Sequence, residues 1–184
     1  MGYMEKYIPW IIGGVVALIL LWVIATYNKL VKLRNRVKDQ DSQIDILLKK
    51  RYDLIPNIVE TVKGYAAHEK ETLTAVVEAR NSAIANGSKA DDNQIKSAIE
   101  RLLALGESYP ELKADAGFES LRVNLKDVED KITFARQFYN DTVLIYENKI
   151  ETFPSVIIAK MFGFKKVGFL SVDEKEKENV NVRF

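Results

Sequence analysis

Histidine and cysteine, which are frequent metal ligands and catalytic groups, are almost absent from this sequence of 184 residues. His68 is the single histidine, and there is no cysteine. Di-metal sites in helical bundles need Glu-x-x-His pairs, which place carboxylate and imidazole on one helix face, but Tyr65 stands three residues before His68. Phosphate-loop, nucleophile and zinc-ligand motifs are also absent from the sequence. We therefore predict no metal, no cofactor and no catalytic residue, and we interpret His68 as a surface or capping residue.

The best candidate for a role beyond packing is the group Asp53, Pro56 and Asn57. Proline has no N–H, so the carbonyl four residues earlier in a helix is left free, and residues 53 and 57 lie one turn apart on one face. The structural interpretation is a kink whose free groups are satisfied by Asn57 or by a neighbouring helix. The functional interpretation is a partner or self-assembly contact. The pair Tyr139 and Asn140 carries the same two alternatives.

The element that precedes these residues is a long apolar helix. A charge-free run covers residues 8–27, about the length that an α-helix needs to cross a bilayer. Amphipathic aromatic rings, which prefer the headgroup level, flank the run at Tyr7, Trp10, Trp22 and Tyr27. We predict a transmembrane helix over residues 8–27 with a short external tail at 1–7. A cleaved signal peptide has a shorter apolar region, and a soluble core helix is rarely so uniformly apolar.

Charges around the run predict its orientation. Five cations follow it without an acidic residue until Asp39: Lys29, Lys32, Arg34, Arg36 and Lys38. By the positive-inside rule, the carboxyl side faces the cytoplasm of a bacterial inner membrane. The chain as a whole holds 27 basic and 26 acidic residues, so we expect a lipid bilayer and not a nucleic acid as its partner.

Apolar spacing of three, four or seven residues predicts four helices in residues 28–151. The first leaves the membrane without a break and ends near Gly64, and two helices of under 20 residues follow, the second closed by Gly106 and Pro110. The fourth carries a seven-residue repeat interrupted by Thr142. Short connections favour antiparallel neighbours, so we predict an all-α fold. In it, the transmembrane helix continues into a cytoplasmic, up-down-up-down four-helix bundle.

We predict that residues 152–170 form an amphipathic, membrane-proximal segment with a short helix and that residues 171–184 form a polar tail. The apolar side chains of this segment are Val156, Ile157, Met161, Phe162 and Phe164. One interpretation places the segment on the bilayer surface with Lys160, Lys165 and Lys166 toward the headgroups. The other makes it a cap over the open end of the bundle.

Several segments resemble the LemA family of bacterial membrane proteins: RYDLIPNIVETVKGYAAHEKETL (51–73), YPELKAD (109–115), FARQFYNDTVLIYENKIETFPS (134–155), AKMFGF (159–164) and the terminal VRF. The resemblance implies a short external amino terminus, one membrane helix and a cytoplasmic antiparallel helical bundle. It implies no activity. A relative that participates in magnetosome formation suggests, by analogy, membrane shaping.

We therefore predict a non-enzymatic, membrane-anchored scaffold or interaction protein that self-assembles as a homo-oligomer. Unidentified membrane or cytoplasmic proteins are its other expected partners. The alternative is a signal-transducing adaptor that relays input from a partner membrane sensor, since about seven external residues are too few to bind a signal. An enzyme with a pocket inside the helical bundle is a third class, to which the sequence lends no motif.

Overall fold

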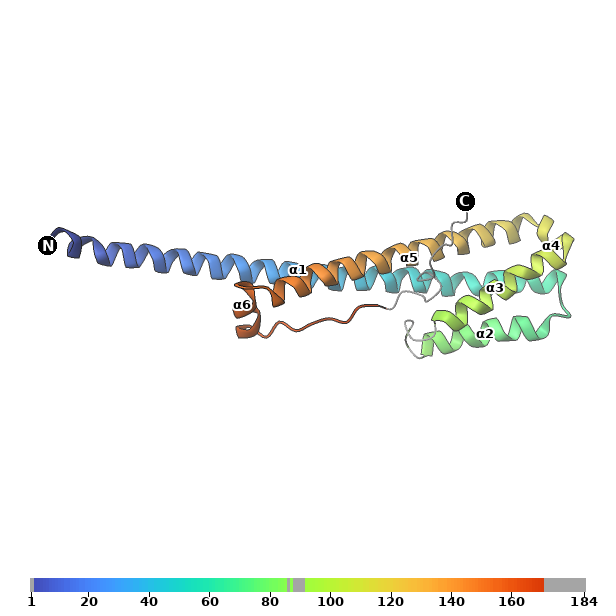
Figure 1. Ribbon diagram of the computed structural model, residues 1–184. Helices are drawn as coiled ribbons and strands as arrows, with labels where there is room; N and C mark the ends of the chain where they lie inside the picture. Colours follow the sequence, from blue (N-terminus) through green and yellow to red (C-terminus); the bar gives the residue numbers. More distant parts are fainter. Residues whose placement is uncertain (1, 86, 88–91, 171–184) are drawn as a thin grey trace, which may run out of the picture. The chain divides into compact units, whose positions relative to one another are not determined.

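The computed structural model describes residues 2–85, 87 and 92–170, with side chains from residue 7 onward except residue 8. Over these residues the chain is all-helical, as predicted (Figure 1). The helices are α1 (Gly2–Tyr65), α2 (Lys70–Ala85), α3 (Asp92–Ser108), α4 (Pro110–Ala114), α5 (Ala116–Glu151) and α6 (Ser155–Met161). The polar tail predicted at 171–184 lies outside the described residues.

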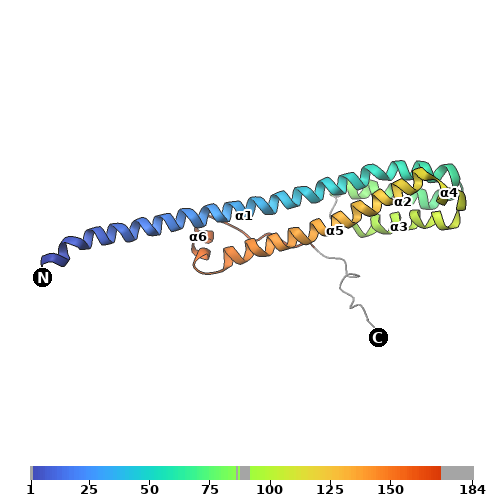
Figure 2. The same ribbon diagram turned by 90° about the horizontal axis from the view of Figure 1, so that it is seen from above.

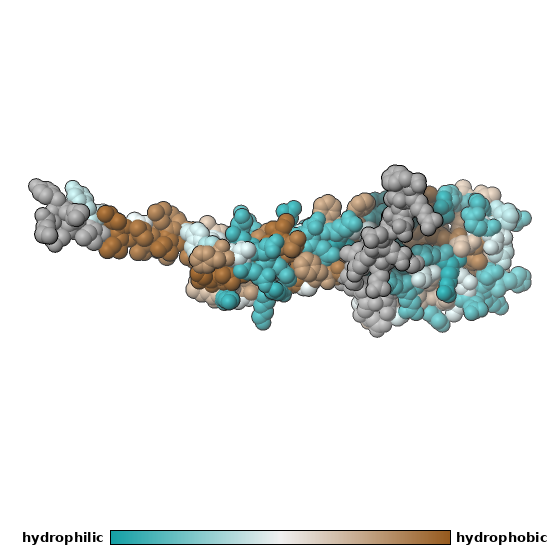
Figure 3. Space-filling view, in the orientation of Figure 1, coloured by the Kyte–Doolittle hydropathy of each residue, from teal (hydrophilic) through white to brown (hydrophobic). Residues whose placement is uncertain are grey.

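Helix α1 is 64 residues long and contains both the apolar run and Pro56 without a break. Its predicted end near Gly64 is confirmed, because the helix stops at Tyr65. In the described part of the chain, α1 is the helix long and apolar enough to cross a membrane, with a mean hydropathy of 2.3 over its most apolar window. The side chains of residues 9–22 are all exposed, and Figure 3 shows them as a hydrophobic surface.

The chain divides into two units, and α1 and α5 each contribute a part to both. Unit 1 comprises Met1–Asp41 and Arg136–Phe184, and unit 2 comprises Ser42–Ala135. Each unit has its own buried apolar residues, so we describe each by itself.

In unit 2, α2 and α3 lie side by side along the second part of α1 (Figures 1 and 2). The α1 side chains buried there follow the predicted spacing: Ile44, Leu48, Ile55, Ile58 and Val62. The spacing predicts that α2 buries one face made of Leu73, Val76, Val77, Ala83 and Ile84. Leu73, Val76 and Ala83 are buried as predicted, but Val77 and Ile84 are exposed and Ala79 is buried. Small side chains at 79 and 83 allow close approach of a neighbouring helix, which turns the bulkier pair outward.

The α3–α5 connection corrects one prediction. Gly106 does not close α3, which continues to Ser108 and ends directly before Tyr109 and Pro110, the other pair predicted to close it. Gly106 instead makes room for a ring, because a Cβ there would lie 2.8 Å from Phe118 Cε1. Asp115 then caps α5 by accepting the Phe118 N–H at 2.7 Å. This bond and a weaker one from Tyr65 lower the pKa of the Asp115 carboxyl.

In unit 1, the second part of α5 buries Val143, Tyr146 and Ile150, and α1 buries Leu30 and Val37. Thr142 interrupts the apolar repeat and is nevertheless buried. Its Oγ1 donates to the Phe138 carbonyl at 2.7 Å, so the hydroxyl is satisfied within its own helix. After α6, the chain turns back along α5 (Figures 1 and 2).

Candidate functional site

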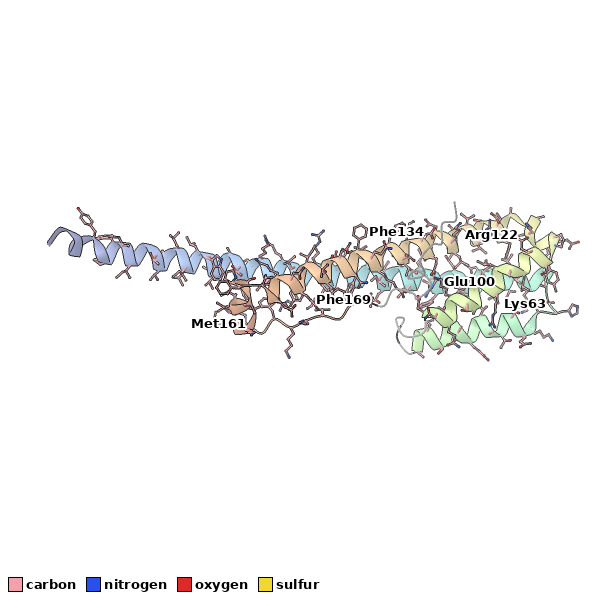
Figure 4. The ribbon with its side chains drawn as sticks, in the orientation of Figure 1. Lys63, Glu100, Arg122, Phe134, Met161 and Phe169 are labelled. Atoms are coloured by element: carbon pink, nitrogen blue, oxygen red, sulfur yellow. The ribbon has the colours of Figure 1, made fainter. Side chains whose placement is uncertain are left out.

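The short helix α6 has one buried and one exposed side. Ile158, Ala159 and Ser155 are buried, and the Ser155 hydroxyl bonds to the Lys149 and Thr152 carbonyls at 2.7 and 3.0 Å. These bonds attach the start of α6 to the end of α5. The exposed side carries large apolar side chains: Phe153 (80% exposed), Ile157 (54%), Met161 (63%) and Phe162 (51%). Figure 4 shows Met161 at the end of this helix.

An aromatic cluster connects α6 to α1 at the carboxyl end of the apolar run. The Tyr27 ring lies 4.7 Å from the Phe162 ring and 5.9 Å from the Phe164 ring, measured between centroids. Arg34 Cζ stands 5.3 Å from the Phe164 centroid, a cation–π distance. The structure thus brings together four residues that the sequence placed in two separate segments.

The remaining sequence-predicted residues of this region lie along α1 and on α6. Tyr7, Trp10 and Trp22 are exposed along α1. Lys29 and Lys32 are also exposed, about two and three helical turns beyond Trp22. Val156 is half-buried on α6.

The segment after α6, residues 164–170, which we call the C-terminal arm, is held by side chains of α5. Tyr146 donates to the Lys165 carbonyl at 2.9 Å, and Tyr139 donates to the Gly168 carbonyl at 3.1 Å. Asn140 makes two bonds to Leu170: its Nδ2 donates to the carbonyl at 3.0 Å and its Oδ1 accepts the N–H at 2.9 Å.

All of these bonds go to the backbone of the arm, and Glu147 adds another by accepting the Val167 N–H at 3.2 Å. Tyr139 and Asn140, ambiguous in the sequence, therefore anchor an extended segment. Burial raises the pKa of the Tyr146 hydroxyl, although the charge of Arg34 acts in the opposite direction. The seven-residue repeat of the sequence contains Tyr139 and Tyr146 and thus indicated this face of α5. The repeat did not reveal what the two tyrosine hydroxyls bind.

The Asp53, Pro56 and Asn57 group lies on the surface of unit 2, with all three residues exposed. Asp53 pairs with Lys49 at 2.8 Å, one turn earlier on the same helix. The carbonyl that Pro56 leaves without a helical donor belongs to Tyr52, and Arg80 of α2 donates its Nε–H to this oxygen at 2.9 Å. A neighbouring helix thus satisfies the group that the proline frees.

A buried charge network in unit 2 was not predicted. Arg51 is fully buried; it donates to Glu129 of α5 at 2.9 Å and to Asp92 of α3. Its Nε is buried and has no hydrogen-bond partner among the described residues. Burial alone would lower the pKa of Arg51, but the carboxylate of Asp92 and then that of Glu129 raise it on balance. The position of Arg51 could have indicated its burial, because Arg51 lies three residues after Leu48 and four before Ile55, where the helical period expects an apolar side chain.

Metal ligation finds no support in the described residues, where no group of three or more His, Cys, Asp or Glu side chains could hold an ion. His68 is exposed in the connection between α1 and α2. The contacts described above are apolar contacts, cation–π contacts, ion pairs and hydrogen bonds to backbone groups.

Comparisons with known proteins agree with the family resemblance. The family model described as the LemA family matches residues 40–184. A LemA protein of Metamycoplasma hominis is 26% identical over 160 residues, covering 84% of this chain and 73% of that protein. The magnetosome protein MamQ of Magnetospirillum gryphiswaldense is 21% identical over 173 residues, covering 78% of this chain and 64% of that protein. MamQ 2 of Paramagnetospirillum magneticum is 25% identical with the same coverage. Because the family model matches well over half of its residues, this chain belongs to the LemA family.

Proposed function

We propose that this protein is a non-enzymatic scaffold, anchored in the bacterial inner membrane, that self-assembles at the cytoplasmic face. The observation that carries the proposal is α1 itself, since one helix contains the exposed apolar run and then supplies buried side chains to unit 2. In a membrane, the run satisfies its backbone within the helix and places its apolar side chains against lipid. The process served is membrane shaping or organisation, for which the name of the MamQ relatives as magnetosome proteins is the support.

The proposed topology has the amino terminus outside and both units in the cytoplasm, because the cations follow the apolar run. The native sequence has no cysteine, so single cysteines report topology cleanly. In intact cells, a membrane-impermeant maleimide should label a Gly2→Cys variant and should label Lys63→Cys only after lysis. The reverse pattern would reject the orientation.

Helix α6 lies on the bilayer surface in this proposal. Four apolar side chains on and beside this helix are more than half exposed, Phe153, Ile157, Met161 and Phe162, whereas a cap over the bundle would bury them. Lys160 is exposed on the same short helix, which gives it the composition of an interfacial helix. A spin label at Met161→Cys should relax more strongly with lipid-soluble oxygen than with a water-soluble nickel complex. A label at Lys63→Cys is the control, and equal behaviour of the two labels would favour the cap.

Unit 2 is interpreted as the up-down-up-down four-helix bundle that the sequence predicts. Its support is that polar contacts from α1 reach three other helices: Arg51 bonds to α3 and α5, and Tyr52 accepts from α2. Such a bundle offers a stable surface for partner proteins. The proposed scaffold needs no catalytic activity.

The proposal of self-assembly rests on an exposed apolar face of α5. Phe134, Phe138 and Ile145 are 60%, 63% and 55% exposed, and their spacing of four and seven residues places them on one side of the helix. Figure 4 shows the Phe134 ring pointing away from α5. The proposed occupant is a helix of a second copy, since an apolar seam of this spacing fits another helix.

The mass of the detergent-solubilised full-length protein tests this step. The native protein should exceed one chain per particle, and the double variant Phe138→Ser with Ile145→Ser should shift toward the monomer. Leu144→Ser, which alters an equally exposed side chain on another side of α5, should leave the mass unchanged. A strictly monomeric native particle would count against self-assembly through any face.

A further inference from the structure

A hollow of about 340 Å³ lies in unit 1, between α1, α5 and the first residues of the C-terminal arm. Arg34 and Lys38 of α1 line one side, and Lys165 and Lys166 of the arm line another. Aromatic and aliphatic side chains complete the wall, among them Phe164. The hollow is therefore a pocket with a cationic rim and partly apolar walls.

Its charge balance is strongly positive. Among the described residues that line it, four are cations and one, Asp41, is a carboxylate. Lys166 pairs with Glu151. Arg34, Lys38 and Lys165 have no ion-pair partner within the part of the chain that the structure describes. Three cations around one concave site favour a ligand with concentrated negative charge, such as a phosphate.

Tyr27 indicates how far the pocket lies from the apolar core of the bilayer. This residue ends the apolar run, and its ring contacts Phe164, which lies beside Lys165 in the chain. Arg34 is seven residues further along α1, about 10 Å at 1.5 Å per residue. The polar layer on each side of a bilayer is roughly 5–8 Å thick, and long helical side chains lean toward the amino terminus, here toward the membrane. The guanidinium and the Lys165 ammonium can therefore reach the phosphate level.

We propose that this pocket binds the phosphate headgroup of an anionic glycerophospholipid, held by Arg34, Lys38 and Lys165. The proposal rests on the membrane anchoring proposed above. A lipid is favoured over a soluble phosphate because the exposed apolar side chains of Met161 and Phe162 stand next to the pocket-lining Gly163 and Phe164 in the chain. These side chains offer a surface for acyl chains, which a soluble ion would not use.

The arm sets the position of two of the cations. Tyr146 binds the Lys165 carbonyl, and Glu147 binds the N–H of the residue after Lys166. Both bonds use only backbone groups of the arm, so the ammonium group of Lys165 stays available for a ligand. The hydrogen-bonded arm on α5 is thus the support of the lipid site.

Native mass spectrometry of the full-length protein from mixed micelles tests the proposal. The micelles contain phosphatidylglycerol and phosphatidylcholine with identical acyl chains in equal amounts. We expect retained phosphatidylglycerol on the native protein, and a loss of roughly tenfold or more in the Lys38→Gln, Lys165→Gln double variant, at about 1 kcal/mol per cation. Hydrogen exchange at Val167 and Leu170 should be unchanged in this variant, which shows that the arm stays in place.

The matched control is Lys29→Gln with Lys32→Gln, which removes two cations of the same basic run that do not line the pocket. This control should lose threefold or less. Equal losses in the two double variants would overturn the pocket in favour of a diffuse basic surface. Displacement of the lipid by millimolar glycerol 1-phosphate would overturn the lipid assignment in favour of a soluble phosphate.

Failure of this site is distinguishable from failure of the anchor. If the pocket binds no lipid but the Gly2→Cys and Lys63→Cys labelling pattern holds, then the membrane scaffold stands and the lipid proposal falls. If the labelling pattern fails as well, then the anchoring on which the site rests is wrong.

Discussion

Removal of the Asp92 carboxylate should destabilise unit 2 far more than removal of an exposed ion pair. In an Asp92→Ala variant, Arg51 would remain fully buried with its Nε already unpaired and with Glu129 as its remaining carboxylate. Breaking a buried pair costs about 3–5 kcal/mol. Because the Glu129 bond at 2.9 Å persists, we expect the lower end, about 3 kcal/mol.

Native-state hydrogen exchange of α3 amides in the micelle-bound full-length protein measures this cost. A loss of about 3 kcal/mol corresponds to exchange that is faster by roughly 150-fold where the amides exchange by local opening. The matched control is Lys131→Ala, which breaks the Lys131–Asp127 pair at 2.8 Å, with side chains 54% and 48% exposed. An exposed pair at this spacing contributes about 0.3–0.5 kcal/mol, so the control should change exchange less than threefold.

Two further results decide whether the buried pair is the cause. Asp92 also lies in the first turn of α3, where a carboxylate stabilises the helix by up to about 1 kcal/mol. An acceleration of fivefold or less for Asp92→Ala would therefore refute the reasoning. Adding Arg51→Met to Asp92→Ala should restore part of the lost stability, because the uncompensated buried charge is then removed.

Three other substitutions have expected outcomes. Gly106→Ala should lower the free energy of unfolding by about 1–3 kcal/mol, because its Cβ would lie 2.8 Å from a buried ring, and chemical denaturation measures the loss. Arg80→Met should cost about 1–3 kcal/mol in the same assay, since it removes the hydrogen bond from the Arg80 Nε–H to the Tyr52 carbonyl. For Asp115, the lowered pKa means that its contribution is present above the unfolded value near 3.8 and is lost as the pH falls through the folded value. Asp115→Asn should therefore lose less stability than the native protein on acidification below about pH 4.

Each of these has its own control. Gly64→Ala meets no atom within 4 Å and should be neutral or stabilising, so a similar loss at both glycines would contradict the ring argument. In a Pro56→Ala background, the backbone N–H of residue 56 can donate to the Tyr52 carbonyl, so Arg80→Met should cost less there. An undiminished cost would contradict the role assigned to Arg80. Parallel acid profiles of Asp115→Asn and the native protein would show that this carboxylate does not titrate with folding.

The predictions that held concern patterns contained within single helices. The end of α1 at Tyr65 and the buried spacing of Ile44, Leu48 and Ile55 follow from a helical period that neighbouring residues define. The sequence also identified Tyr139 and Asn140 as residues of interest. It could not assign their roles, because their partners are the backbone groups of Gly168 and Leu170, about 30 residues away.

Predictions that failed, or were never made, depend on distant neighbours. Gly106 has the composition of a helix end, but a ring from the next long helix requires its missing Cβ. Val77 and Ile84 have the composition of a core face, but both are exposed, and the small side chain of Ala79 is buried on this helix instead. Arg51 looks like any exposed cation of a charged helix until its two carboxylates are placed around it.

By itself, the sequence determined the all-α class, the apolar run with its cationic flank, and the LemA family, because hydropathy, charge order and motif order are properties of the chain alone. Only the tertiary structure decided which polar groups meet. Burial of Arg51, the arm on Tyr139 and Asn140, and the cations around Phe164 all join residues that are far apart in sequence. Such contacts depend on how helices pack, and the spacing of residues along one helix does not encode the side chains that another segment brings against it.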